Sequence, residues 1–306
     1  MALHEALTYK DWDRADMLIT DRVARGDLLN EIFLGQLPLH VAVAKGAPTH
    51  LVERLLASYP EGAETAGENG RLPLHDAAAS GGNAIAIFDM LLTAFPDSAR
   101  AVDASGRSAM HFAVSGALET QSSPEIIALL HSHNPDAAMM ADEKGCLPLH
   151  LAAGDGSLAT INCLLEIAPQ SISVVDQQQK TPLHWASFKD SAPEVLLQLL
   201  AAYPAACLAA DTRGQIPLHL VSRARTKNAL AKAAALLEAC PASVHYHQKD
   251  GKDALTLAVG AGSRNARMSE QLRRWICASR TCNSHVVRRR TLKIICARSH
   301  LIKLCA

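Results

Sequence analysis

Six histidines recur along the chain at nearly regular intervals. Histidine is the side chain best suited to binding a metal ion or transferring a proton near neutral pH. The six residues are His40, His75, His111, His150, His184 and His219. Ligands of one zinc ion must lie within about 4 Å of each other, because each bond to the metal is about 2 Å long. The distance between successive histidines therefore decides between a chemical role and a structural one.

A second candidate metal set lies near the C-terminal end of the sequence. It comprises Cys277, Cys282, Cys296 and His300, with His285 and Cys305 nearby. The spacing lacks the close CxxC pair that is typical of zinc sites. Ordinary thiols are the favoured interpretation and a zinc site is the alternative, so we predict no metal and no other cofactor.

Motifs of the common enzyme classes are absent from the sequence. It contains no GxSxG, GxxxxGK, GxGxxG or HExxH string, and these strings mark hydrolases, phosphate-binding loops, dinucleotide sites and zinc proteases. Asp103, Asp142, Asp176 and Asp211 each lie three residues before a recurrent Gly or Gln179. That periodicity indicates turn formation rather than acid–base chemistry. We therefore predict that the protein is not an enzyme.

The histidines belong to an eight-residue string that recurs seven times. The string begins at positions 35, 70, 106, 145, 179, 214 and 251, as GQLPLHVA, GRLPLHDA, GRSAMHFA, GCLPLHLA, QKTPLHWA, GQIPLHLV and GKDALTLA. Proline at the first helical position is favoured, since the N–H it lacks would be unpaired there. Each PLH string therefore predicts the start of a helix.

A second string, LLxxxP, follows within the repeats. It occupies residues 55–60, 91–96, 164–169, 199–204 and 236–241, and a form longer by one residue occupies 129–135. Proline disfavours helix in the residue that precedes it, so this string predicts the end of a second helix. Each repeat is thus predicted to be a helix, a turn and a helix.

These strings resemble the ankyrin repeat, whose signature is a TPLHxA string that recurs with a period of about 33 residues. The resemblance implies an all-α solenoid of stacked helix–turn–helix units joined by turn or hairpin fingers. One hairpin cannot bury its apolar face alone, so stacked neighbours must stabilise it. The family's capping Thr before Pro is replaced by Leu or Ile in four repeats, and only Ser108, Thr181 and Asp253 are expected to cap through their side chains.

Three regions are predicted. Residues 1–34, with the string LHEA, form a degenerate N-terminal capping repeat, and residues 35–280 form an array of about seven repeats. Residues 281–306 form a basic tail that belongs to no repeat and need not be ordered. The interval between the third and fourth strings is longer than the others, and this predicts an insertion at residues 116–123 that lengthens the turn between two helices.

The solenoid also bears on the histidines. Equivalent residues in adjacent repeats lie about one helix-packing distance apart, roughly 8 to 10 Å. Two such histidines cannot share a metal ion. We therefore expect each imidazole to bond backbone groups in the turn before its helix.

Charge and apolar content indicate an intracellular protein with two zones. Residues 1–263 carry 19 Lys and Arg against 29 Asp and Glu, whereas residues 264–306 carry 11 against the single Glu270. No uninterrupted apolar run reaches the length of about 18 residues that a membrane helix needs, and no secretory signal is recognised. We expect the cytoplasm or the nucleus, where the eight cysteines would stay reduced.

The resemblance implies a protein-binding module, a scaffold or adaptor that is itself monomeric. Contacts are expected at turn tips and on the concave face of the first helices. An exposed aromatic ring at Phe188 is the strongest single signal, although this ring could instead pack on Trp185 or on the next repeat. The predicted contact residues are Lys144, Lys180, Phe188, Lys189, Arg213 and Arg223.

Two rival functions remain open. Arg288, Arg289 and Arg290 begin a basic cluster, so the tail 281–306 could make the protein an adaptor for nucleic acid or anionic lipid. The cluster could equally be a nuclear address, a solvated end, or a segment that folds back on the acidic body. The other rival function is that of a regulatory or structural subunit of a larger complex.

Overall fold

The computed structural model describes residues 2–25, 30, 32–33, 35–81, 84–115, 124–155, 157–224, 226–261 and 266–281. The insertion predicted at 116–123 and the tail from residue 282 onward lie outside these ranges. The chain divides into two compact units, Met1–Tyr203 and Pro204–Ala306. Each unit has its own stack of helices.

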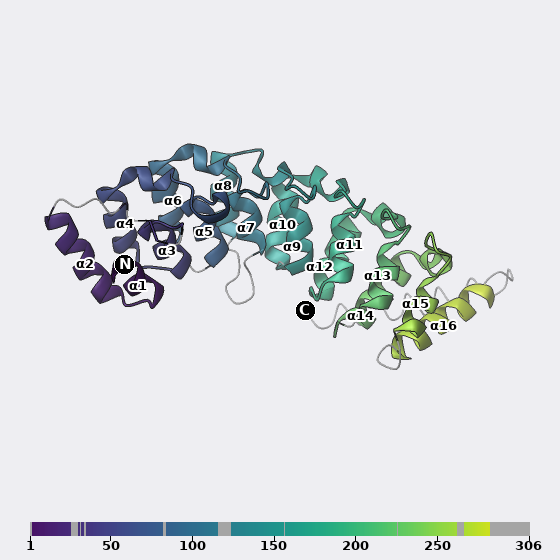
Figure 1. Ribbon diagram of the computed structural model, residues 1–306. Helices are drawn as coiled ribbons and strands as arrows, with labels where there is room; N and C mark the ends of the chain where they lie inside the picture. Colours follow the sequence, from purple (N-terminus) through teal and green to yellow (C-terminus); the bar gives the residue numbers. More distant parts are fainter. Residues whose placement is uncertain are drawn as a thin grey trace, which may run out of the picture. The chain divides into compact units, whose positions relative to one another are not determined.

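The first unit consists of helix pairs. The first helix of each pair contacts the first helix of the next, and second helices likewise contact second helices, as Figure 1 shows for α3, α5 and α7. The helices are α1 (Ala2–Thr8), α2 (Trp12–Ala24), α3 (Pro38–Lys45), α4 (Thr49–Ser58), α5 (Pro73–Ser80), α6 (Ile85–Ala94), α7 (Ala109–Ser115), α8 (Pro124–His133), α9 (Pro148–Asp155), α10 (Leu158–Ile167), α11 (Pro182–Phe188) and α12 (Pro193–Ala202).

The second unit repeats this arrangement with α13 (Pro217–Arg223), α14 (Ala229–Ala239), α15 (Ala254–Gly260) and α16 (Ala266–Thr281). Helix α13 packs on α15, and α14 packs on α16. Met268 and Leu272 of α16 are buried. These two residues therefore belong to the core of the unit. Across the described ranges of both units only isolated β-bridges are found, so the all-α repeat fold predicted from the sequence is confirmed.

Small and large apolar residues alternate between the two helix layers. Ala42 of α3 and Ala77 of α5 are fully buried, and a residue this small lets neighbouring first helices approach closely. The second helices supply bulk, with Leu51 in α4 and Ile87 and Phe88 in α6 also buried. Because each layer packs against the next repeat as well as its own partner, the core is continuous within the unit.

The prolines of the LLxxxP strings do more than end a helix. Helix α4 ends at Ser58, and Pro60 then begins a short 3₁₀ helix. The other 3₁₀ helices that begin at such a proline are η3 (Pro96–Ala99), η5 (Pro169–Ser173), η6 (Pro204–Leu208) and η7 (Pro241–His245). In the third string the extra residue delays this turn to η4 (Ala137–Met139). The sequence pattern predicts the helix end but gives no sign of the 3₁₀ turn.

The fingers between repeats stack through their backbones. In the first unit the Gln177 N–H donates to the Lys144 carbonyl at 2.9 Å, and in the second the Lys249 N–H donates to the Arg213 carbonyl at 3.1 Å. Gly214 adopts a positive φ of 74°, and a Cβ added there would lie 2.9 Å from Lys249 N. A side chain at this glycine would therefore push the neighbouring finger away.

The tight finger stacking can be tested with two alanine substitutions. Gly251 has a φ of +78°, but a Cβ there would meet no atom within 4 Å. Gly251→Ala should therefore reduce the free energy of unfolding only through backbone strain, by about 1 kcal/mol. Gly214→Ala should add a steric cost of about 1 kcal/mol or more. Urea unfolding measures both variants, and equal losses would show that the stacking tolerates a side chain.

Candidate protein-binding surface

The turn histidines are held by backbone groups on their own repeat. In every case Nδ1 accepts a hydrogen bond from the N–H of the residue three positions earlier. The distances are 3.3 Å for Leu37 to His40, 3.0 Å for Leu72 to His75, 3.1 Å for Ser108 to His111, 3.0 Å for Leu147 to His150, 3.1 Å for Thr181 to His184 and 3.1 Å for Ile216 to His219. Because Nδ1 accepts, the ring proton is assigned to Nε2.

The Nε2–H of five of these histidines donates to a carbonyl of the following repeat. The pairs are His40 with Arg71 at 3.2 Å, His75 with Ala101 at 3.1 Å, His111 with Cys146 at 3.0 Å, His150 with Lys180 at 3.1 Å and His219 with Tyr246 at 3.1 Å. His4 makes the same contact with the Gln36 carbonyl at 3.0 Å. Sequence reasoning missed this second contact, although the recurrence of histidine itself was its signal.

Capping follows the prediction at one of the three expected positions. The Asp253 carboxylate accepts from the Thr256 N–H at 2.8 Å. At Thr181 and Ser108 the hydroxyl lies 2.9 Å from the histidine Nδ1 instead, and Thr181 makes no side-chain cap hydrogen bond. At Thr181 both the backbone N–H and the hydroxyl thus contact the His184 imidazole.

Among the residues described, no group of three or more His, Cys, Asp or Glu side chains could hold a metal ion. Cys277 is exposed. The other members of the predicted set, Cys282, His285, Cys296, His300 and Cys305, lie outside the described residues.

Four of the predicted contact residues belong to the first unit. Lys144 and Lys180 stand in adjacent fingers, where the Lys180 Nζ donates to Gln178 Oε1 at 2.7 Å. Phe188 ends α11 with 53% of its surface exposed. Lys189 follows it and pairs with Asp155 at 3.3 Å. Helix α11 has seven residues and is therefore about 10 Å long. Lys180, in the finger before this helix, and Phe188, its last residue, lie at its opposite ends.

The remaining two predicted residues belong to the second unit. Arg213 stands at the tip of the finger before α13, and Arg223 is the last residue of that helix. Both side chains are exposed. Each unit thus presents a cation at a finger and an exposed residue at the far end of a first helix.

An arginine–aromatic cluster in the first unit was not predicted. The Phe112 ring lies between two guanidinium groups, with Arg71 Cζ 4.5 Å and Arg107 Cζ 4.4 Å from its centroid. Asp103 Oδ2 accepts from Arg107 Nη2 at 2.9 Å, and Arg71 Nη1 lies 3.7 Å from the Asp76 carboxylate. Such stacked guanidinium groups are rigid, and Arg and aromatic residues are enriched in binding hot spots.

Asp76 is the unusual member of this cluster. Its carboxyl group is buried, and Oδ2 has no hydrogen-bond partner. Burial raises the pKa of Asp76 to about 6, and the Arg71 guanidinium opposes that rise. The signal that would have revealed the cluster is an aspartate directly after His75, where most other repeats have an apolar residue.

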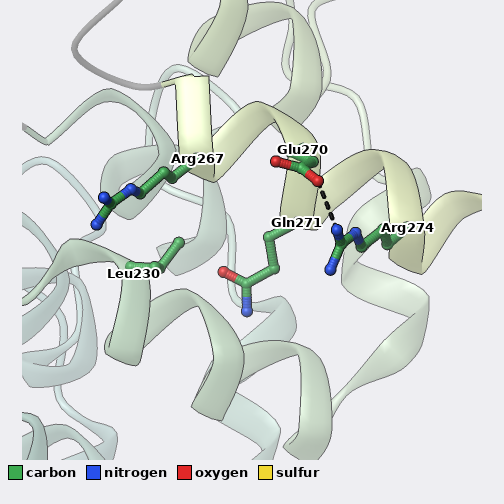
Figure 2. A pocket seen from close by; sticks show the side chains of 5 residues that line it. All are labelled: Leu230, Arg267, Glu270, Gln271 and Arg274. Atoms are coloured by element: carbon green, nitrogen blue, oxygen red, sulfur yellow. Dashed lines mark hydrogen bonds and ion pairs between the residues drawn. The ribbon is translucent and has the colours of Figure 1, made fainter.

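A groove marks the outer helices of the second unit. It has a cavity volume of about 450 Å³ and is lined by Leu230 of α14 and by Arg267, Glu270, Gln271 and Arg274 of α16. Figure 2 shows the Glu270–Arg274 ion pair on one side of this space. The residues that line it carry two arginines against one glutamate.

Charge divides between the two units. Residues 1–203 contain 12 Lys and Arg against 25 Asp and Glu, and residues 204–306 contain 18 against 5. In the helices that the structure describes, none is long and apolar enough to span a membrane.

Stacked helix pairs, backbone-linked fingers and exposed side chains at the ends of the first helices define an all-α repeat protein. The sequence matches the family described as "Ankyrin repeats (3 copies)" over residues 39–136 and 117–206. Together the two segments cover more than half of the chain, which belongs to the ankyrin-repeat family. Repeats of this family generally serve as protein–protein interaction modules.

Two curated proteins illustrate the similarity. The chain is 32% identical over 149 residues to B-cell lymphoma 3 protein of Homo sapiens, a match that covers 46% of this chain and 32% of that protein. It is 27% identical over 128 residues to Inversin of Canis lupus familiaris, which covers 41% of this chain and 12% of Inversin. The chain thus spans a third or less of the length of these relatives.

The histidine contacts predict a loss of stability in acid. Burial lowers the pKa of His40, His75, His111, His150 and His219 below the ordinary value of 6.5. Below about pH 6.5 the unfolded chain therefore binds more protons than the folded one, and the free energy of unfolding falls as the pH falls. The loss is up to about 1.4 kcal/mol per pH unit for each histidine that stays neutral.

Urea unfolding at pH 7.5, 6.5 and 5.5 measures this effect. Asp76 has the opposite effect on the free energy of unfolding. Because its pKa is raised in the folded chain, the folded chain takes up a proton at a higher pH than the unfolded chain does, and this stabilises the fold as the pH falls. Asp76→Asn should therefore make the acid loss steeper. Equal stability at pH 7.5 and 5.5 in this variant would contradict a neutral, buried histidine network.

Proposed function

We propose that this chain is a non-catalytic scaffold or adaptor that binds a partner protein through its finger tips and the concave face of its first helices. The family supports a protein partner, because stacked repeats create extended binding surfaces. The observation that carries the proposal is the exposure of Phe188. A half-exposed aromatic ring at the end of a short helix has little structural reason to be there.

In the first unit the proposed contacts are Lys144, Lys180, Phe188 and Lys189. Trp185 lies between the finger and Phe188, and its Nε1–H donates to Asp176 Oδ2 at 3.1 Å. This bond fixes the indole against the finger turn. The alternative, that Phe188 is taken up by packing on Trp185 or the next repeat, is weakened by the exposed area that the ring retains.

In the second unit the proposed contacts are Arg213 and Arg223. Both side chains are exposed, whereas Gly214 shapes the finger and His219 links the repeats. Arginine also offers several donors in a planar group, which suits it to binding carboxylates on a protein surface. We infer that such a partner is met inside the cell, in the cytoplasm or the nucleus.

A double substitution tests the contact surface. A partner is first identified by affinity capture and mass spectrometry, and its affinity is then measured against Phe188→Ala combined with Arg223→Ala. We expect a loss of at least tenfold, because each residue is placed as a hot spot. Leu197→Ala is the matched control, since Leu197 is exposed to a similar extent but belongs to α12, a second helix.

Circular dichroism must first establish that each variant retains its helical content. Unchanged affinity in the folded double variant would refute the assignment of these two residues. Equal losses in the double variant and in Leu197→Ala would place the partner on the second helices instead.

The alternative function is an adaptor for nucleic acid or an anionic membrane that acts through the tail 281–306. The excess of basic over acidic residues in the second unit favours it. Phosphate binding weakens linearly in the logarithm of salt concentration, with a slope of about 0.9 for each phosphate neutralised on duplex DNA.

A salt titration separates the protein-binding function from the nucleic-acid function. Duplex DNA is titrated, from 50 to 300 mM salt, into the full chain and into a chain that ends at residue 281. If the tail binds phosphates, the full chain should bind with a steep salt slope that the truncated chain lacks. Absence of binding by the full chain at the lowest salt would count against a nucleic-acid adaptor, and anionic vesicles in place of DNA test the membrane form.

A further inference from the structure

Two cysteines of the second unit meet although they lie one repeat apart in the sequence. Cys207 is buried in η6, and Cys240 is a half-buried residue at the C-terminal cap of α14. The Cys207 thiol lies 3.7 Å from the Leu236 carbonyl oxygen, and the Cys240 N–H donates to the same oxygen at 2.9 Å. The two residues therefore meet at one carbonyl oxygen, and Cys240 is close enough to contribute to the raised pKa of the Cys207 thiol.

The repeat architecture explains this proximity. Cys207 is the third residue after Pro204, and Cys240 directly precedes Pro241 of the next repeat. In the first unit the equivalent residues are Ala99 and Asn134, and there the Asn134 Nδ2 donates to the Ala99 carbonyl at 3.0 Å. The fold thus brings these two positions together in both units, and cysteine occupies both of them in the second unit.

The two thiols differ in their access to an oxidant. Burial raises the pKa of Cys207 to about 12, and the neighbouring Cys240 adds to the rise. Cys207 therefore stays protonated and is a poor nucleophile on its own at neutral pH. Cys240 is half-buried whereas Cys207 is buried, so Cys240 is the more accessible of the two to a small oxidant.

We propose that Cys207 and Cys240 form a reversible disulfide when the protein meets a hydroperoxide. The Cys240 sulfur attacks hydrogen peroxide, an S–O bond forms as the O–O bond breaks, and the leaving hydroxide takes the Cys240 thiol proton and departs as water; an organic hydroperoxide would release its alcohol instead. The Cys207 sulfur then attacks the Cys240 sulfenic acid; an S–S bond forms, the S–O bond breaks, and the thiol proton leaves with the hydroxide as a second water. Two electrons pass from the thiols to the peroxide.

The disulfide would close a loop from Cys207 to Cys240, which spans one whole repeat. The loop contains Arg213 in the finger and helix α13, which ends at Arg223. Cross-linking restricts the unfolded chain, so the second unit should become more resistant to unfolding when oxidised. This inference does not depend on the proposed binding function, since it concerns the core side of the repeat.

The full chain is reduced, exchanged into buffer without thiol and treated with hydrogen peroxide. Free thiols are then alkylated and the protein is digested with trypsin without reduction. We expect residues 190–213 linked to residues 233–249, a product that dithiothreitol reverses. The thermal midpoint of the second unit should rise by roughly 5 °C on oxidation and return on reduction.

Cys207→Ala and Cys240→Ser are the control variants, and both should lose the link and the shift. Alanine is the residue at the Cys207 position in two other repeats, as Ala63 and Ala99, so Cys207→Ala should fold. The exposed Cys277 reports that the oxidant has reacted. Oxidation of Cys277 without the 207–240 link would overturn the proposal, as would a link that forms without any thermal shift.

Discussion

The hydrogen bond between a histidine Nε2–H and a backbone carbonyl of the next repeat is the contact on which the stacking depends. One imidazole satisfies an N–H at the start of its own helix and also bonds a finger carbonyl of its neighbour, as His150 does with the Lys180 carbonyl, which accepts from the Asp176 N–H as well. The Nδ1 hydrogen bond requires a neutral ring, because a protonated Nδ1 cannot accept, and burial favours the neutral ring by lowering the histidine pKa. Stacking is thus built from backbone groups that every repeat possesses, whatever its surface residues.

The stacking of the fingers also depends on hydrogen bonds to backbone groups of the next repeat. The Lys249 N–H reaches the Arg213 carbonyl only because Gly214 leaves room for the approach. Gln179 replaces the glycine in one finger and still adopts a positive φ of 60°. The finger conformation is therefore imposed by the stack and by the aspartate turn, with Asp176 Oδ1 accepting from Gln178 and Lys180, and not by glycine alone.

The sequence predicted most of the fold because proline and histidine mark helix starts that are local and periodic. It could not predict contacts in which one repeat meets another through groups that vary. The Thr181 hydroxyl was expected to cap a backbone N–H, and its contact with the His184 imidazole at 2.9 Å was not predicted. Asp76 looks like a solvated charge in the string PLHDA, and only the fold shows that it is buried and lies beside Arg71. Phe188 and Arg223 are exposed, as predicted, but their role as contact residues stays a prediction.

Repeat symmetry separates positions that serve stability from positions that are available for recognition. The residues that link repeats lie at the start of the first helix, in the finger turn and around the closing proline. The finger tips and the far ends of first helices are the positions that we propose for recognition. Cys207 and Cys240 lie near the closing prolines, at positions that serve stability. A change of side chain there alters how two repeats are joined. Their oxidation would therefore act on the cohesion of the second unit and leave the exposed arginines chemically unchanged.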